Sequence, residues 1–225
     1  MKVSRERFAE NRARIVDAAS RLFREKGFDG VGLDAVMEAA GLTHGAFYGH
    51  FASKEDLIAQ ACAAAFAHAD ESWRAAAAPR RKLARLYLAE DHCADRARGC
   101  GFAALGADVA RQGGGARRAL GGALEKRVDA LAARLTGPPA ARRRRAIATW
   151  AGLVGSLVLA RAVGDAGFSR EILAAGRTAF GGDGPRRRRT ARSSRRQGPA
   201  LRRQSFTAGS MILSTGRPPT SSSGR

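Results

Sequence analysis

Apolar residues recur at helical spacing along most of this chain, and glycine or proline separates one such stretch from the next. In residues 12–26 the apolar side chains fall at positions i, i+3, i+4, i+7 and i+8, as on one face of an amphipathic helix. No stretch alternates apolar and polar residues as a half-buried strand does, so the sequence predicts an all-α fold. Further helical patterns cover residues 33–40, 54–78, 81–93, 102–112, 116–135, 142–163 and 169–180.

A short third helical stretch, residues 44–51, follows the stretches 12–26 and 33–40. A tight glycine turn separates it from the second stretch. The second stretch ends at Gly41, and Thr43 is a suitable N-cap for a short helix that ends near residue 51. Ser53 then opens the next helix with the Ser-x-x-acid pattern of a capping box. This is the outline of a helix-turn-helix, whose last helix lies in the major groove of DNA.

The short third helix carries side chains that suit close contact with DNA. Gly45 and Ala46 keep one face low, His44 can reach a base edge, and the methyl group of Ala46 can touch a thymine methyl. Tyr48 and His50 alone are more often core or surface residues than DNA ligands, and their joint placement behind the glycine turn favours DNA binding. Groups that can contact phosphate oxygens are present at Thr43, Tyr48, His50 and Lys54.

Residues 39–57, Ala-Ala-Gly-Leu-Thr-His-Gly-Ala-Phe-Tyr-Gly-His-Phe-Ala-Ser-Lys-Glu-Asp-Leu, resemble the signature of the TetR (TetR/AcrR-like) family of transcriptional repressors. That signature contains an Ala-Gly turn, a Tyr-x-His-Phe and a Ser-Lys-Glu-x-Leu, and all three occur here at matching spacing. The resemblance covers roughly residues 10–60. The family often has Thr or Ser before its second helix, whereas this chain has Gly32, which lacks a hydroxyl for phosphate. The resemblance implies a recognition helix made by Thr43, His44, Gly45, Ala46 and Phe47, with phosphate contacts from Tyr48, His50 and Lys54.

The resemblance also implies a division into two domains. Residues 1–56 would form the helix-turn-helix DNA-binding domain, and residues 57–182 a helical ligand-binding and dimerisation domain, which resembles the family more loosely at residues 153–163 and 171–173. In the family, the second domain forms the dimer and encloses a small-molecule pocket whose occupancy changes the spacing of the two DNA-binding heads. The resemblance therefore implies a ligand-responsive repressor that binds a palindromic operator as a homodimer and is released by an unknown small-molecule inducer.

A nearly all-apolar helix over residues 146–160 indicates where two copies would meet. Such a helix must be buried, and it is shorter than the roughly twenty residues that span a bilayer, although four arginines precede it as they do in some membrane anchors. We expect it to form half of a four-helix bundle with residues 169–180 across a two-fold axis. The candidate interface residues are Ala151, Gly152, Gly155, Ser156, Leu159 and Ile172.

The ligand pocket is harder to place, because aromatic and aliphatic residues at helical spacing are core residues far more often than ligand contacts. Cys100 lies between two glycines and could begin a helix, where a thiolate is stabilised, so it could be either a sensor of oxidants or a small core residue. His92, Cys93 and Cys100 lack the paired short spacing of zinc sites, and neither a metal nor a cofactor is expected. The candidate lining residues are Phe66, Trp73, Tyr87, Cys100, Phe102, Leu105 and Trp150, with Leu86 and Val109 beside them.

The net charge of +20 does not lie in the predicted DNA-binding domain. Residues 1–60 hold nine basic and nine acidic residues, whereas residues 181–225 hold eleven basic residues and one acidic residue. Residues 183–225 are rich in Arg, Ser and Gly and poor in apolar residues, so we expect them to be a disordered tail. Their composition would also fit out-of-frame translation in a GC-rich genome. The alternative function is therefore nonspecific nucleic-acid binding by this tail.

Other function classes have little support in the sequence. No Gly-x-Ser-x-Gly elbow, phosphate-binding glycine loop or His-Glu-x-x-His occurs, so we do not expect an enzyme. The N-terminus has no apolar run of a secretory signal, and the odd number of cysteines favours a reducing compartment, which together predict a cytoplasmic protein without a membrane partner. The expected partners are double-stranded operator DNA, a second copy of the chain and a small molecule.

Overall fold

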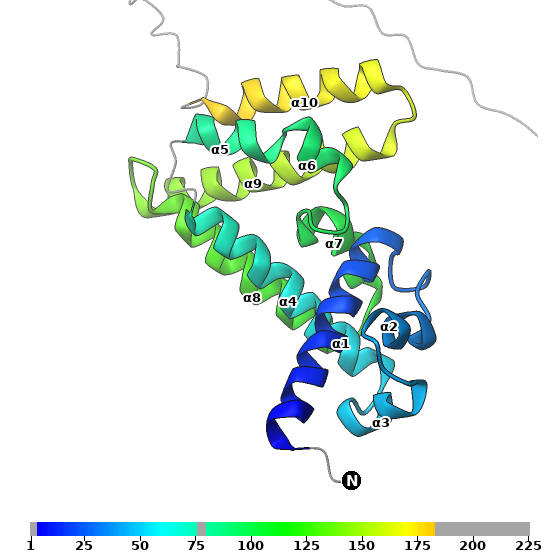
Figure 1. The fold of residues 1–225 in the computed structure, drawn as a ribbon. Helices are drawn as coiled ribbons and strands as arrows, with labels where there is room; N and C mark the ends of the chain where they lie inside the picture. Colours follow the sequence, from blue (N-terminus) through cyan, green and yellow to red (C-terminus); the bar gives the residue numbers. More distant parts are fainter. Residues whose placement is uncertain (1–3, 76–79, 183–225) are drawn as a thin grey trace, which may run out of the picture. The chain divides into compact units, whose positions relative to one another are not determined.

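The computed structural model describes residues 4–75 and 80–182, with side chains described for residues 4–67 and 81–182. Every element in these two ranges is a helix, which confirms the predicted all-α fold (Figure 1). The expected tail over residues 183–225 lies outside the described residues. The elements are α1 (Arg5–Lys26), α2 (Leu33–Ala39), η1 (His44–Ala46), α3 (Phe47–His50), α4 (Lys54–Ala75), α5 (Arg80–Tyr87), α6 (Glu90–Ala94), α7 (Gly101–Arg111), α8 (Gly114–Ala132), α9 (Pro139–Ala162) and α10 (Ala166–Gly181).

The first four elements and the start of α4 pack around a shared apolar core, which we call the head (residues 4–56). Helix α1 begins at Arg5, earlier than its apolar pattern, because the Ser4 hydroxyl accepts a hydrogen bond from the Arg7 amide at 3.2 Å and caps the first turn. Gly27 and Gly41 end α1 and the α2 segment with positive φ angles of 75° and 65°. Fully buried side chains of this core include Ile15, Phe23, Met37, Phe47 and Leu57.

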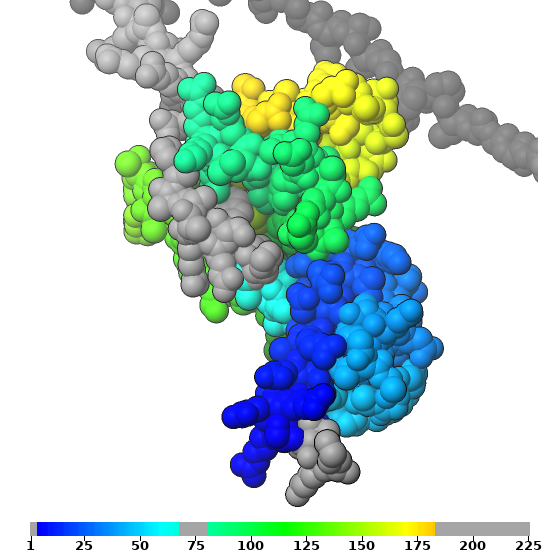
Figure 2. Space-filling model, in the orientation of Figure 1, coloured from blue at the N-terminus to red at the C-terminus, as the bar shows by residue number. Residues whose placement is uncertain are grey.

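Helix α4 joins the head to the remaining helices without a break. The domain boundary expected between residues 56 and 57 falls within its first turn, because α4 begins at Lys54. The helix packs against α1 of the head and against α8, so both parts of the molecule share it (Figure 1). In the space-filling view the residues of α1 to α3, coloured blue to light blue, form one end of the described molecule (Figure 2).

The second part of the molecule, which we call the body, consists of the helices that follow α4. Helix α9 packs against α8 and α10, α10 also packs against α5, and α7 contacts α1, α4, α8 and α9 (Figure 1). The side chains of Leu105, Leu153, Leu157 and Leu173 are fully buried in its core. Within residues 4–75 and 80–182, no helix is both long and apolar enough to cross a membrane.

Two of the small residues of α9 that were predicted for the dimer interface lie beside α10 of the same chain. A side chain at Gly152 would overlap the ring of Phe180 on α10. A Cβ at Gly176 of α10 would lie 2.7 Å from the hydroxyl oxygen of Ser156. Gly152 and Ser156 thus pack against α10 of the same chain, and their part in a dimer interface stays a prediction.

The helix expected over residues 81–93 is divided into α5 and α6. The backbone carbonyl of Leu88 accepts a hydrogen bond from Nη1 of Arg177 on α10, at 2.7 Å. The carbonyl of Tyr87 interacts with the His92 ring at 2.6 Å. Side chains thus satisfy the two carbonyls that a continuous helix would have paired with backbone amides.

Candidate nucleic-acid interface

The turn between α2 and η1 sets the position of the predicted recognition helix. The amides of Gly41 and Leu42 donate to the carbonyls of Glu38 and Met37 at 2.8 and 2.9 Å, which closes the end of α2. Thr43 then occupies the N-cap position of η1, but its side chain makes no capping hydrogen bond. One turn of 3-10 helix leads into α3, so the recognition helix is short and its first residues are exposed.

Four of the predicted DNA contacts, Thr43, His44, Gly45 and Tyr48, are all exposed and follow one another along η1 and the start of α3. The side chain of Tyr48 is 67% exposed, and its ring lies 5.9 Å from the ring of His44. A Cβ added at Gly45 would meet no atom within 4 Å. Packing within the protein therefore does not require a glycine there, and the surface is open for close approach of a partner.

Phe47 does not belong to this surface. Its side chain is 0% exposed and stacks on Phe51, with 5.5 Å between ring centroids. The predicted contact of Phe47 with DNA is therefore wrong, because a fully buried ring cannot reach a groove. Phe47 instead anchors the recognition helix to the core of the head, and Ala46 beside it is half-buried.

Asp34 of α2 is part of the exposed surface and was not predicted from the sequence. Its carboxylate contacts Nδ1 of His44, and its side chain is 86% exposed. This contact orients the imidazole ring relative to α2. Nothing in the spacing of the two residues indicates the contact, because it depends on how the turn folds back.

The predicted phosphate contacts His50 and Lys54 both interact within the head. The Lys54 ammonium donates to the carbonyl of Phe28 at 3.0 Å, which ties the start of α4 to the segment after α1. The ring of His50 lies 4.1 Å from the ring of Phe8, and burial, with a smaller contribution from Arg12, lowers the pKa of His50 below its usual value. His50 in the free protein is therefore less readily protonated than a histidine in water.

Arg12 and Arg14 hold the recognition helix in place, a role that the sequence did not reveal. The guanidinium of Arg12 donates to the carbonyl of His50 and to Gln60 Oε1, the latter at 2.9 Å, and lies 4.5 Å from the centre of the Phe51 ring. Arg14 donates to the carbonyl of Ala40 at the end of α2. These bonds fix α2 and α3 against α1 and α4.

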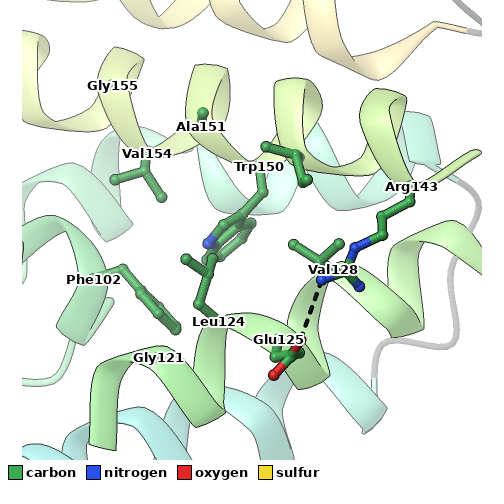
Figure 3. Close-up of a pocket in the computed structure, with 11 residues that line it drawn as sticks. Phe102, Gly121, Leu124, Glu125, Val128, Arg143, Trp150, Ala151, Val154 and Gly155 are labelled. Carbon is green, nitrogen blue, oxygen red and sulfur yellow. Dashed lines mark hydrogen bonds and ion pairs between the residues drawn. The ribbon is translucent and has the colours of Figure 1, made fainter. Parts of the chain in front are cut away.

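A cavity of about 660 Å³ lies between α7, α8 and α9 of the body (Figure 3). At one end, Arg143 pairs with Glu125 at 3.2 Å and with Asp129 at 2.7 Å. Two predicted pocket residues, Phe102 and Trp150, line this cavity, as do Ala151 and Gly155, which were predicted for the dimer interface. The remaining lining is mostly aliphatic: Gly121, Leu124, Val128, Ile147 and Val154.

Most other predicted pocket residues are buried behind this lining. The Phe66 ring lies 4.8 Å from Phe102, and the Tyr87 ring 5.2 Å from Trp150, so the structure brings these four rings together. Leu86 is 52% exposed and does not line this cavity. The side chain of Trp73 lies outside the described residues. Core positions that do not line the cavity are Phe66, Tyr87, Cys100, Leu105 and Val109.

The remaining predicted interface residues differ in exposure. Leu159 is 58% exposed, whereas Ile172 is half-buried against the core. Val158 on the same helix and Phe168 on α10 are 39% and 52% exposed. Together, Val158, Leu159 and Phe168 form an exposed apolar set on α9 and α10.

Known proteins match most of the head in sequence and more than three quarters of the chain in fold. The family model described as "Bacterial regulatory proteins, tetR family" matches residues 15–61. The HTH-type transcriptional regulator AcrR of Shigella flexneri is 43% identical over 51 residues, which cover 23% of this chain and 24% of that protein. The chain thus spans about a quarter of the length of this relative.

Solved structures extend the likeness to the body. A TetR-family transcriptional regulator from Cytophaga hutchinsonii has a TM-score of 0.64 at 20% identity, covering 79% of this chain and 96% of that one. A TetR transcriptional regulator from Chloroflexus aurantiacus has a TM-score of 0.63 at 21% identity, covering 77% and 95%. At this level of identity the likeness shows a shared fold.

Proposed function

This chain carries the DNA-binding domain of the TetR family of bacterial regulators, and from this premise we propose that it is a ligand-responsive transcriptional repressor. We propose that it binds a palindromic operator as a homodimer and leaves DNA when a small molecule binds the body. The observation that carries the proposal is the exposed face of η1 and α3. There a turn typical of the helix-turn-helix presents Thr43, His44, Gly45 and Tyr48 to solvent.

Base recognition and positioning fall to different residues of this face. His44 lies at the start of the recognition helix, where side chains reach base edges, and its contact with Asp34 limits the directions in which the ring can point. Gly45 allows the backbone to approach the groove floor. The hydroxyl groups of Thr43 and Tyr48 suit phosphate oxygens, and such contacts fix the register without reading sequence.

Dimerisation explains how a head without net positive charge can hold DNA. Residues 1–60 contribute equal numbers of basic and acidic side chains, so one head gains little from the phosphate backbone. Two linked heads bind with the advantage of effective concentration. The exposed apolar side chains of Leu159 and Phe168 are our candidate for the dimer surface, since α9 and α10, which carry them, pack against each other.

The inducer would bind the cavity between α7, α8 and α9. Its volume lies in the range of small-molecule sites, about 300–1,000 Å³. Its lining is apolar apart from the Arg143 and Glu125 pair at one end, which favours a largely apolar molecule with one polar end. Helix α7 contacts α1 of the head, so a ligand that moves α7 can change the position of the head.

Footprinting on DNA flanking the gene, followed by gel shifts with two variants, tests the proposal. We expect Tyr48→Phe to weaken binding by a similar factor on matched and mismatched operators, because the lost hydroxyl contacts phosphate. We expect His44→Ala to change the preferred base at one position of each half-site. Equal effects of both variants on all sequences would contradict the assigned roles, and the absence of any protected palindrome would contradict the proposed function.

A further inference from the structure

Three arginines line a second cavity, where the end of α1 meets α7 and the end of α9. Its volume is about 320 Å³, and its charged lining consists of Arg24, Arg96, Arg161 and one acidic residue, Glu25. The other lining residues are Gly27, Ala103, Ala104, Val158 and Ala162. The charge facing this cavity is therefore predominantly positive.

Arg24 of α1 is the most deeply buried of the three arginines. Arg24 is 6% exposed, and its Nε donates to the carbonyl of Ala97 at 2.6 Å. Its Nη1 is buried and has no hydrogen-bond partner in the described part of the chain. Burial lowers the pKa of Arg24, which is the mark of a cation that the protein does not fully compensate.

Arg161 of α9 has the same incomplete pairing. Its Nε and Nη2 donate to the carbonyls of Cys93 and His92 at 3.0 and 2.8 Å, whereas its Nη1 is buried and has no partner among residues 4–67 and 81–182. Arg96 donates to the carbonyl of Arg161 at 3.2 Å, which brings a third guanidinium to the same place. Within the described ranges, none of the three arginines forms an ion pair with a carboxylate.

A buried guanidinium without a carboxylate is costly, and an anion bound in the cavity would supply the missing negative charge. We propose that this cavity binds a small anion, a carboxylate or phosphate group of a metabolite, through Arg24, Arg96 and Arg161. The volume lies at the lower end of the range for ligand sites and suits a compact molecule. Gly27 and the two alanines of α7 keep the rest of the lining small.

This anion site is separate from the apolar cavity described above, because the two share no lining residue. It joins α1 of the head to α9 of the body, with Arg24 on one side and Arg161 on the other. Arg161 and Arg96 also line a neighbouring cavity beside α10, which Arg24 does not line. The binding itself does not depend on the proposed function.

Thermal unfolding of the full chain, titrated with inorganic phosphate or with acetate at constant ionic strength, tests the site. Because the anion binds the folded state, we expect the Tm to rise with at least one probe by about 3–6 °C at ten times its dissociation constant. Arg96→Gln, at an exposed position, removes one donor and should weaken the affinity about tenfold. The absence of a saturable rise with both probes would overturn the proposal.

Arg98→Gln provides the matched control. Arg98 is also exposed, lies two positions from Arg96 and pairs with Asp95, but does not line the cavity. Phosphate also stabilises folded proteins by being excluded from their surface, and this effect is equal in both variants. The site is supported if only Arg96→Gln weakens the response, and overturned if the two variants respond alike.

A second pair of variants tests the same site without removing an arginine. Ala103 of α7 lines the cavity, so Ala103→Glu would place a carboxylate beside the guanidinium groups, whereas Ala103→Gln has the same shape without the charge. We expect the Glu variant to lose the phosphate and acetate response and the Gln variant to retain part of it. A Glu variant that responds as strongly as the unmodified protein would overturn the proposal.

Discussion

At the scale of single residues, packing of the protein does not require a glycine at position 45, whereas the proposed close approach to DNA does. A Cβ at this position would meet nothing within 4 Å, and the residue is exposed on η1. We therefore expect Gly45→Leu to leave the Tm within about 2 °C, as for most surface changes. The same variant should lose at least about tenfold in operator affinity, because the added side chain holds the backbone away from the groove floor.

Gly122→Leu is the control for this prediction, since Gly122 is also exposed and a Cβ there also meets no atom within 4 Å, but it lies on α8 of the body. It should leave operator affinity unchanged in gel shifts. If Gly45→Leu binds the operator as tightly as Gly122→Leu, the recognition helix does not approach DNA at Gly45.

His92 makes stability depend on pH. Its Nε2 accepts a hydrogen bond from the Cys100 amide at 3.1 Å, and its Nδ1 donates to the carbonyl of Tyr87 at 2.6 Å, so the folded protein requires the neutral ring. Burial lowers the pKa of His92 below its usual 6.5. The unfolded chain therefore binds more protons at pH values around and below 6.5, and the free energy of unfolding should fall as the pH is lowered through that range.

Urea unfolding at pH 7.5 and at pH 5.5 measures this effect, and His92→Gln identifies its source. The Gln side chain can also accept the Cys100 hydrogen bond but does not titrate, so the variant should lose part of the pH dependence. The remainder should come from His50, whose pKa is also lowered by burial. An unchanged pH dependence in His92→Gln would show that the ring does not control it.

At the scale of helices, the apolar pattern predicted most of the elements but not their ends. Three consecutive glycines were expected to separate two helices, yet α8 begins at Gly114 and includes Gly115. A Cβ at Gly115 would lie 2.9 Å from the Cβ of Ala59, so this glycine lets α8 approach α4 closely. Close packing between distant segments determines such a boundary, and a local pattern does not contain that information.

The same limit applies to the site. The turn, the exposed residues of η1 and the capping of α4 by Ser53 follow from local spacing, and the structure places the Ser53 hydroxyl 3.2 Å from the Asp56 amide as expected. The burial of Phe47 and the contact of Asp34 with His44 depend on how the helices pack. The apolar cavity was only partly predictable, because core and lining residues have the same composition.

The contact between α9 and α10 leads to a prediction about stability. A Cβ at Gly176 would lie 2.7 Å from Leu88 Cδ1 and 2.9 Å from the Cβ of Ser156. Gly176→Ala should therefore lower the free energy of unfolding by about 1–3 kcal/mol through overpacking, although alanine is the better helix former. Urea unfolding measures the change.

Gly155→Ala is the matched control, since a Cβ there meets no atom within 4 Å on the same pair of helices, and it should be neutral or stabilising by up to about 1 kcal/mol. Combining Gly176→Ala with Ser156→Gly should show a favourable coupling in a double-mutant cycle, because the second change removes one of the overlapping atoms. Strictly additive changes in the free energy of unfolding would mean that α9 and α10 move apart in the Gly176→Ala variant, so that the added methyl group does not overlap Ser156.

At the scale of the whole molecule, the head and the body are linked by more than the continuous α4. Asp108 of α7 accepts a hydrogen bond from the amide of Phe28, at 3.4 Å, directly after the end of α1. A Cβ at Gly27 would lie 2.9 Å from the same carboxylate, so α1 ends in close contact with α7. A ligand that binds next to α7 therefore acts on a helix that directly contacts the end of α1 in the head.

The distribution of charge leads to the last prediction, which concerns residues 183–225. The formal charge of the chain is +20, but residues 1–60 have no net charge and eleven basic residues lie beyond residue 180. If the exposed face of η1 and α3 determines specificity, truncation after Gly182 should leave the dimer and the affinity for the operator at physiological salt nearly unchanged. The truncated protein should lose much of its affinity for unrelated DNA, and the dependence of that affinity on salt should fall by about 0.9 in the log–log slope for each phosphate contact removed. Sedimentation measures the dimer, and operator and random duplexes titrated across a salt series measure both affinities. A truncated protein that becomes monomeric would show that residues 183–225 contribute to the dimer. One whose operator affinity falls as far as its affinity for random DNA would show that these residues and not the recognition helix dominate binding.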